Sequence, residues 1–457
     1  MKWINFISQR NHQFWPRRTC AKESLAPILS AFKPEVIGFS VMSVNYKISK
    51  ILAGLAKKKL PDLPVIFGGI HPTIAPEETI QEDCVDIICR GEGEETITEF
   101  LASLEKGEDT STIKGLWVKS KGKTSRNPVR PLVQNIDSLP FPDREALSRS
   151  RLRAELYGVN LLSSRGCPFP CSYCQNKYLI DLYKGQGNFV RYRSVENIFA
   201  EIDEIIRLYN PNRLSFSDES FTLNKEHLRE FCTKYPKKYQ IPFLCQTRPD
   251  LVDEETARLL KEAGCDFINM AIESGNPKIR NEILKRNIPT KKIIEAFSLA
   301  HKYGIRTGSF NMIGLLEENI STIWDTINLN KRLQPDRMMC TVYMPFRGTE
   351  LGEKCLSQGW LAHPIDDSEV YYTYVSIKHP AISGRALFGY QGFFDYYVRL
   401  SPAFYWLIDI FRFFYQRLPL TTNRISPLTR ALREALINFV YKMKRFLPSQ
   451  GFFMKTR

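Results

Sequence analysis

Residues 164–176 read Ser-Arg-Gly-Cys-Pro-Phe-Pro-Cys-Ser-Tyr-Cys-Gln-Asn and place Cys167, Cys171 and Cys174 in one short loop. A spacing of three residues and then two lets all three sulfurs converge on one inorganic cluster. Thiolates are the ligands that iron–sulfur clusters prefer. The loop lacks a fourth cysteine. A four-iron cluster held by three thiolates keeps one iron open for a substrate or cosubstrate, as a catalytic zinc keeps one position free.

Besides an iron–sulfur cluster, three other interpretations of the cysteine loop are possible. Zinc could use a distant fourth ligand, although structural zinc motifs usually pair Cys-x2-Cys with a second such pair. The odd number and the crowding argue against disulfides. Chance spacing is the third, since 11 cysteines in 457 residues is ordinary usage. The remaining cysteines are not clustered, and we expect most of them to be small core residues: Cys20, Cys84, Cys89, Cys232, Cys245, Cys265, Cys340 and Cys355.

The loop resembles the signature of the radical S-adenosylmethionine (SAM) enzymes, in which an aromatic residue precedes the last cysteine, as Tyr173 does here. The resemblance implies a 4Fe-4S cluster on Cys167, Cys171 and Cys174. It also implies that the reduced cluster splits SAM into methionine and a 5′-deoxyadenosyl radical, which abstracts hydrogen from an unactivated carbon. A low-potential electron donor such as flavodoxin or ferredoxin would be a partner.

Length and composition predict a folded protein of two or three domains. The chain has 457 residues, 43% of them hydrophobic and 25% charged, as in ordinary globular proteins. Scattered cysteines fit a reducing compartment. Residues 1–7 lack an apolar stretch long enough for a secretory signal. We therefore expect a cytoplasmic protein.

Strand and helix patterns alternate in residues 1–110. Short buried strands are predicted at 36–42, 64–69 and 85–89, with a helix over 46–58 and another that ends near 104. This alternation predicts an α/β fold with a parallel, doubly wound, Rossmann-like sheet. Ligands of such sheets bind at the loops that follow the strands.

Two of these loops, Gly-Gly-Ile-His-Pro-Thr (68–73) and Arg-Gly-Glu-Gly-Glu-Glu (90–95), resemble the cobalamin-binding domain that precedes many radical SAM enzymes. Plain turn chemistry is the alternative for the glycines. The Asp-x-His-x-x-Gly motif of other cobalamin proteins is absent from the sequence, as is common in the radical subgroup. Residues 1–33 represent the first strand and helix poorly, so we expect a shortened domain. The resemblance implies cobalamin contacts at Ser40, Met42, Ser43, Gly68, Gly69, His71, Gly91, Glu92 and Gly93.

Residues 111–156 are predicted to be a linker, because prolines and the charged run 119–123 interrupt regular structure. Residues 157–350 then repeat strand and helix six times. Six units predict an open partial (β/α)6 barrel, which matches the fold that the resemblance implies, with its active site beyond the carboxyl ends of the strands. The predicted strands are 159–163, 213–217, 242–246, 267–272, 307–313 and 338–343.

Polar residues follow these strands in order. Glu273 suits a ribose diol, because an ionised carboxylate accepts two hydrogen bonds. Arg248 suits a carboxylate or a phosphate-like group, and Tyr343 and Arg347 are expected to face the substrate. Residues 217–220 are either ligands of the SAM amino group or a helix cap. No catalytic residue is assigned. The resemblance implies SAM contacts at Tyr173, Asp218, Glu219, Arg248, Glu273, Ser274, Asn311 and Gly314.

Residues 351–457 are predicted to be a helical, aromatic and basic region. From residue 380 onward there are 12 Lys and Arg against 3 Asp and Glu, together with 18 aromatic residues. No uncharged run reaches the ~20 residues of a membrane-spanning helix. The pattern fits a cap packed on the enzyme, or a helix lying at the inner face of a membrane. No nucleic-acid docking motif is present, so nucleic acid is not expected as a partner.

Three functions remain open on the sequence. The first is cobalamin-dependent radical C-methylation of a small-molecule or lipid-like substrate. The second is a radical rearrangement, cyclisation or oxidation without methyl transfer. The third is a metal-binding protein without turnover.

Overall fold

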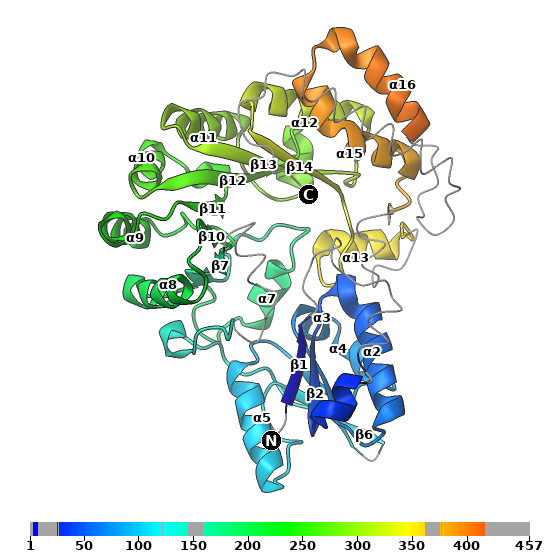
Figure 1. Ribbon diagram of the computed structural model, residues 1–457. Helices are drawn as coiled ribbons and strands as arrows, with labels where there is room; N and C mark the ends of the chain where they lie inside the picture. Colours follow the sequence, from blue (N-terminus) through cyan, green and yellow to red (C-terminus); the bar gives the residue numbers. More distant parts are fainter. Residues whose placement is uncertain are drawn as a thin grey trace. The chain divides into compact units, whose positions relative to one another are not determined.

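The computed structural model describes residues 3–7, 25, 27–120, 122–144, 159–361, 375 and 377–415 (Figure 1). Cys20 and the basic stretch after residue 415 lie outside the described residues. The chain divides into two compact units. The N-terminal unit comprises residues 1–134, 177–188 and 344–372. The barrel unit comprises residues 135–176, 189–343 and 373–457.

The N-terminal unit is built on one six-stranded sheet whose strands follow one another in chain order. The first four strands pair in parallel and the last two are antiparallel. The three strands predicted for residues 36–89 are confirmed. In order, the strands are β1 (Trp3–Ile7), β2 (Val36–Ser40), β3 (Val65–Gly68), β4 (Ile87–Cys89), β5 (Leu116–Ser120) and β6 (Lys123–Arg126).

Helices cover both faces of this sheet. Side chains alternate along β2, so Ile37 and Phe39 face one way and Val36 the other. On the first side α2 (Tyr46–Lys59) buries Leu52 in the same cluster as Ile37, and on the other α5 (Glu94–Lys106) packs against Val36. Two short helices follow β3, namely α3 (Ile70–Ile74) and α4 (Pro76–Gln81).

The strands of this sheet follow one another in chain order. The shortened domain stays a prediction, because residues 8–24 lie outside the described residues. In a doubly wound sheet the strand order reverses at one point, where ligands bind in a crevice. Among the strands that the structure describes here, the order never reverses. The carboxyl ends of β2, β3 and β4 therefore form one continuous edge.

A hairpin occupies residues 116–126, where the sequence analysis expected a linker. Strands β5 and β6 extend the sheet, and the side chains of Trp117 and Val118 are buried against its two faces. Gly122 has a φ of 76°, in the left-handed region that favours glycine. The described residues of the charged run lie at the end of β5, at Gly122 and at the start of β6, and the charges of the run hid the strand pattern.

The barrel unit contains a second six-stranded sheet in which all neighbouring strands are parallel. All six predicted strands are confirmed, and β14 and β7 lie at the two edges, so the barrel is open. Across the sheet the order is β14 (Arg337–Val342), β13 (Arg306–Ile313), β12 (Cys265–Glu273), β11 (Phe243–Thr247), β10 (Leu214–Phe216) and β7 (Val159–Leu161).

Five amphipathic helices link these strands and cover the sheet (Figure 1), and four of them begin with a side-chain cap. The first begins after Ser194, whose hydroxyl accepts from the backbone N–H of Asn197 at 3.1 Å. Its inner face joins a core in which Phe231 contacts Phe216 and Phe243 edge-on. The helices are α8 (Val195–Tyr209), α9 (Lys225–Lys238), α10 (Glu254–Glu262), α11 (Thr290–Lys302) and α12 (Ile320–Leu333).

The described parts of the C-terminal region are mainly helical in both units. In the N-terminal unit it forms α13 (Glu350–Ser357). In the barrel unit α15 (Gly384–Arg399) packs on α12 and β14, as the cap interpretation predicts, and α16 (Tyr405–Tyr415) packs on α15. Among the described residues, no helix is both long and apolar enough to span a bilayer.

Candidate active site

The cysteine loop follows β8 (Ser164–Arg165), shortly after the end of β7, and is fixed at both sides. Gly166 has a φ of 91°, and a side chain there would meet the carbonyl oxygen of Phe189 at 2.3 Å. Ser172 donates its hydroxyl to the carbonyl of Ile283 at 2.6 Å and its backbone N–H to that of Leu284 at 3.2 Å. The loop is thus tied to the π-helical turn Ile279–Ile283.

All three cysteines of the loop are free thiols. Cys171 is buried, whereas Cys167 and Cys174 are half-buried. Burial raises the pKa of Cys174 to about 11, and the neighbouring Cys171 and Cys167 add to the rise. The pKa of Cys167 is also raised by burial, with Cys171 contributing. The sulfurs therefore interact electrostatically, and a nearby cation or a coordinated metal favours the ionised form of each thiol.

Tyr173 joins the loop to the end of β12. Its hydroxyl donates to Oε1 of Glu273 at 3.1 Å and accepts from Nη1 of Arg286 at 2.5 Å. Arg286 is 5% exposed and also donates Nη2 to the carbonyl of Ala271 at 2.7 Å. Burial raises the pKa of the Glu273 carboxyl, while Arg286 and Tyr173 oppose the rise. Oε1 is occupied by Tyr173, which leaves Oε2 for a diol.

Arg248 follows β11 and lies against the cysteine loop. Its guanidinium carbon stands 3.7 Å from the ring centre of Phe169, and Nη1 lies 3.9 Å from Sγ of Cys171. Arg248 also donates two hydrogen bonds to the Asp250 carboxylate, from Nε to Oδ1 at 3.1 Å and from Nη2 to Oδ2 at 3.0 Å. The sequence predicts a ligand carboxylate at this guanidinium, and in the structure Asp250 occupies that position.

Asp218 follows β10 and is fully buried. Its Oδ1 accepts from the backbone N–H of Ser163 at 2.9 Å and from the hydroxyls of Ser163 and Ser164 at 2.8 and 2.6 Å. Burial raises its pKa, and these donors oppose the rise. Oδ2 is buried without a partner among the described residues. Glu219, its neighbour, is exposed and contributes to the raised pKa of Cys167.

The remaining predicted SAM contacts take part in networks of the barrel itself. Asn311 is buried and accepts from Asn330 at 2.8 Å, and its own amide donates to the hydroxyl of Ser309 at 3.1 Å. Ser274 is fully buried and accepts from the backbone N–H of Asn276 at 3.3 Å.

Gly314 ends β13 with a φ of 79°. A side chain there would approach Leu387 of α15 at 3.1 Å, so this glycine permits packing against the protein. Its backbone N–H, like that of Leu315, is held by Oε2 of Glu318. Glu318 is 1% exposed, and burial raises its pKa to about 8 against those two donors.

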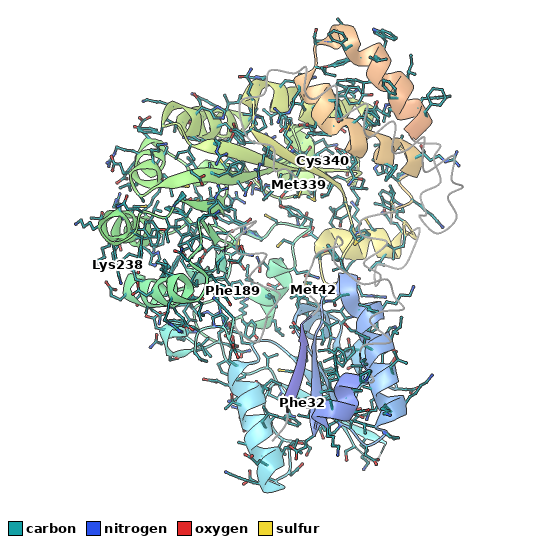
Figure 2. All side chains as sticks on the ribbon, in the orientation of Figure 1. Phe32, Met42, Phe189, Lys238, Met339 and Cys340 are labelled. Atoms are coloured by element: carbon teal, nitrogen blue, oxygen red, sulfur yellow. The ribbon has the colours of Figure 1, made fainter. Side chains whose placement is uncertain are left out.

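In the N-terminal unit, the predicted cobalamin residues line the edge formed by the ends of β2, β3 and β4. Ser40 and Gly69 are exposed there. Met42, which is labelled in Figure 2, is half-buried. A side chain at Gly69 would meet the carbonyl of Val41 at 2.9 Å. Ser43, Gly68, Gly91, Glu92 and Gly93 are buried or half-buried beside them.

His71 lies beneath this edge. It is 4% exposed, stacks on Tyr46 with ring centres 4.0 Å apart, and contacts the hydroxyl of Ser43 through Nδ1 at 3.0 Å. Nε2 is buried and has no partner among the described residues. Burial lowers its pKa to about 4, with Arg347 and Lys50 contributing. The imidazole is therefore neutral at physiological pH.

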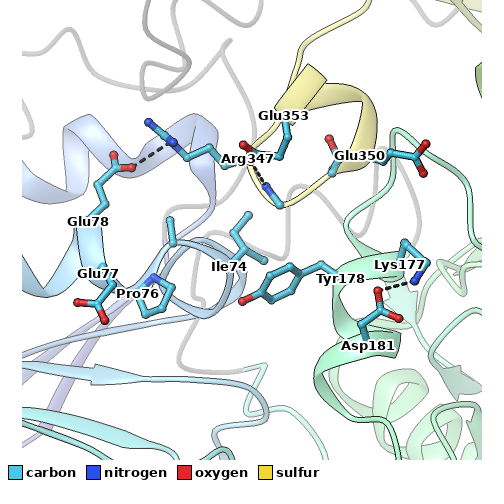
Figure 3. A pocket seen from close by; sticks show the side chains of 13 residues that line it. Ile74, Pro76, Glu77, Glu78, Lys177, Tyr178, Asp181, Arg347, Glu350 and Glu353 are labelled. Atoms are coloured by element: carbon cyan, nitrogen blue, oxygen red, sulfur yellow. Dashed lines mark hydrogen bonds and ion pairs between the residues drawn. The ribbon is translucent and has the colours of Figure 1, made fainter. Parts of the chain in front are cut away.

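Arg347 lines a pocket of about 750 Å³ in the same unit, together with Glu78, Tyr178 and the start of α13 (Figure 3). Its Nε pairs with Oε2 of Glu78 at 3.0 Å. The sequence predicts that Arg347 faces substrate; the structure pairs it with a carboxylate of its own unit.

Several residues of the site carry no sequence signal of their role. Arg286 follows the π-helical turn and is one of many arginines, and Ser163 and Glu318 belong to no motif. The sequence could have indicated Phe169 as a residue of the site, because it lies between the first two cysteines of the loop.

The comparisons with known proteins agree with both units. Residues 161–329 match the family model of the Radical SAM superfamily, and residues 14–101 match that of the B12 binding domain. An uncharacterized methyltransferase of Pyrococcus horikoshii, PH0819, is 32% identical over 342 residues, which is 74% of this chain and 72% of that protein. The chain belongs to the cobalamin-dependent radical SAM enzymes.

Two further relatives of this radical SAM enzyme are more distant. The anaerobic magnesium-protoporphyrin IX monomethyl ester cyclase of Cereibacter sphaeroides is 24% identical over 351 residues, covering 74% of this chain and 55% of the cyclase. The solved structure of the radical SAM methyltransferase TsrM from Kitasatospora setae, with tryptophan and a SAM analogue bound, superimposes with a TM-score of 0.63 at 17% identity. It covers 78% of this chain and 76% of TsrM, and shows a shared fold.

Family membership settles the broad class. The protein is an enzyme of the radical SAM methyltransferase kind, and its cofactors are a 4Fe-4S cluster, SAM and cobalamin. The zinc interpretation and the binding protein without turnover are thereby set aside. The residues present fit these groups: three free thiols share one anchored loop, and Asp218 keeps a buried carboxylate oxygen without a partner.

We expect single replacement of Cys167, Cys171 or Cys174 by alanine to abolish iron binding, because the loop supplies three thiolates and no spare. Iron content and visible absorbance of the anaerobically reconstituted protein measure this. Cys232→Ala is the matched control, since Cys232 is a buried thiol in the core of the same unit. Iron retained in a loop variant at the level of the control would contradict the ligand assignment.

A second prediction concerns Glu318. Burial raises its pKa to about 8 in the folded protein, from the ordinary glutamate value of about 4.5. The folded state therefore binds this proton more tightly, so the associated stability is present at low pH and is lost as the pH rises from about 4.5 to about 8. Glu318→Gln keeps an acceptor and cannot ionise.

The stability of Glu318→Gln relative to the parent should therefore increase between pH 6 and pH 9, as measured by chemical unfolding at a series of pH values. Glu317→Gln, at an exposed neighbouring carboxylate, should follow the parent curve. Parallel curves for Glu318→Gln and the parent would show that Glu318 ionises normally.

Proposed function

We propose that this enzyme transfers a methyl group to an unactivated carbon of a hydrophobic small molecule. The observation that carries the proposal is the pairing, in one chain, of the anchored three-cysteine loop with a cobalamin-binding sheet. When bound, the cluster supplies the electron that cleaves SAM, and cobalamin supplies a methyl carrier. Methyl transfer is also the activity named for PH0819 and for TsrM.

The chain's own residues position SAM in this proposal. Oε2 of Glu273 accepts from the ribose hydroxyls, while Tyr173 and Arg286 hold the carboxylate in place through Oε1. Oδ2 of Asp218 accepts from the ammonium group of the methionine part, because Oδ1 is already saturated by Ser163 and Ser164. Both carboxylates follow parallel strands of one sheet, so they meet the same ligand face.

The second candidate is radical cyclisation or oxidation without methyl transfer. The similarity to the magnesium-protoporphyrin IX monomethyl ester cyclase favours it. In both candidates the same residues hold SAM, and the two differ in the fate of the substrate radical.

The two candidates predict different products. SAM with a deuterated methyl group is incubated with the reduced, cobalamin-loaded protein and a lipid-soluble extract of the producing cells, and mass spectrometry follows the products. Methylation yields a deuterated product together with 5′-deoxyadenosine. Glu273→Gln should lower the formation of both, because a neutral amide accepts one fewer hydrogen bond from the ribose. Production of 5′-deoxyadenosine with unlabelled, dehydrogenated or cyclised product would replace methylation by the second candidate.

We further propose a cytoplasmic enzyme that contacts an anionic membrane surface through its C-terminal region. Five large apolar side chains around α16 are exposed, the most exposed being Trp406 at 63% and Phe414 at 59%. Trp406, Ile410, Phe413 and Phe414 recur at helical spacing on one face. The excess of basic residues after residue 380 supplies charge that complements anionic lipid. Such contact would bring a lipid-like substrate to the enzyme.

Vesicle sedimentation tests this contact. The full-length protein should bind vesicles that contain phosphatidylglycerol, and binding should weaken at high salt and in vesicles of phosphatidylcholine alone. The double variant Trp406→Ser/Phe414→Ser should lose about tenfold in apparent affinity, because it removes two exposed anchors. Met339→Ser, at a 56% exposed side chain on β14 (Figure 2), is the control. Equal binding by both variants would rule out α16 as the contact.

A further inference from the structure

Two arginines are buried beneath the cysteine loop. Arg248 is 6% exposed and Arg286 is 5% exposed. Arg248 donates Nη2 to the backbone carbonyl of Arg286 at 2.8 Å, which links the two residues directly. Buried guanidinium groups are costly unless each is paired, so their position requires anionic groups nearby.

The donors of Arg248 are already distributed among protein groups. Nε and Nη2 hold Asp250, and Nη2 also reaches the carbonyl of Arg286. Nη1 points at Sγ of Cys171, 3.9 Å away. The flat face rests on Phe169, which fixes the plane of the guanidinium. A ligand carboxylate would have to displace Asp250 to form a bidentate pair, whereas a thiolate of the loop is already within reach.

Cys171 is the most buried sulfur of the loop, at 6% exposure. It interacts electrostatically with Arg286 as well as with Arg248, because its charge favours the charged form of Arg286. Hydrogen bonds to cluster sulfurs and nearby charges are among the main determinants of a cluster's reduction potential. An added electron makes the cluster more negative, so a cation at a ligating sulfur stabilises the reduced form.

We propose that Arg248 is a positioning residue that donates to the Cys171 thiolate and, with Arg286 behind it, raises the reduction potential of the cluster. Phe169 and Asp250 orient the guanidinium for this contact. The inference rests on the cluster that the proposed function requires, and it does not depend on what the substrate is or whether it is methylated.

The test measures the midpoint potential of the cluster by EPR-monitored redox titration of the full chain, reconstituted anaerobically without SAM. Arg248→Gln/Asp250→Asn replaces the ion pair by two amides of similar shape, so no buried charge loses its partner. We expect unchanged iron content and a reduction equilibrium at least tenfold less favourable, which is a fall of about 59 mV for one electron.

The matched control is Arg229→Gln/Glu255→Gln, which removes another bidentate pair of the barrel unit, at 2.7 and 2.9 Å, between exposed side chains far from the loop in sequence. Its potential should equal that of the parent. If the Arg248 variant binds iron with the parent potential, the proposal is overturned. An accompanying loss of SAM binding in equilibrium dialysis would then show that Arg248 holds the ligand carboxylate.

Phe169→Leu provides a second variant if the double substitution loses its iron. It leaves every charge in place and removes the ring that orients Arg248. We expect a smaller fall of the potential in the same direction, and an unchanged or raised potential in the iron-loaded variant overturns the proposal. Failure of the proposed function would appear differently, as a parent protein with a normal cluster that forms no methylated product.

Discussion

The barrel unit depends on one electrostatic constraint. The three thiols of the cysteine loop must ionise together in order to hold a cluster. Their charges repel, and burial raises the pKa of Cys167 and Cys174 further. The loop therefore needs rigid attachment as well as compensating charge. Attachment comes from the hydrogen bonds of Ser172 to the π-helical turn. Compensation comes from the guanidinium groups of Arg248 and Arg286, which cannot be deprotonated at physiological pH.

The parallel sheets explain how residues distant in the chain meet. Strands that run the same way deliver their carboxyl ends to one edge, so Ser163, Asp218, Arg248 and Glu273 follow four strands of a single sheet. The N-terminal sheet uses the same rule with a simpler order. The order of its described strands never reverses, so the sheet offers a continuous edge in place of a crevice. Exposed positions on this edge, such as Ser40 and Gly69, are the ones that a ligand would contact.

Sequence patterns predicted the strands and helices that depend on a local periodicity of apolar residues. The six barrel strands, the strands at 36–89 and the capped helix after Ser194 follow from apolar spacing and a capping residue, and the structure confirms them. The β5–β6 hairpin was missed because its outer strand, β6, lies at the edge of the sheet and carries charged residues. The role of Arg286 could not be predicted, since its partner Tyr173 is distant in the chain. Glu318 contacts the turn just before it, but it belongs to no motif. Asn311 and Arg347 show the converse, because other residues of the protein already engage their polar groups.

The backbone of Glu273 adopts a strained conformation that the surrounding structure holds in place. Its φ of 67° lies in the left-handed region, which disfavours residues with a Cβ by roughly 1–2 kcal/mol. Gly275 packs so tightly that a side chain there would meet the carbonyl of Asp325 at 2.3 Å, which prevents the turn from relaxing outward. Glycine at 273 would relieve the strain and lose the carboxylate. The fold thus keeps a carboxylate at the end of β12 although this backbone conformation disfavours a side chain there, which supports the proposal that Glu273 holds SAM.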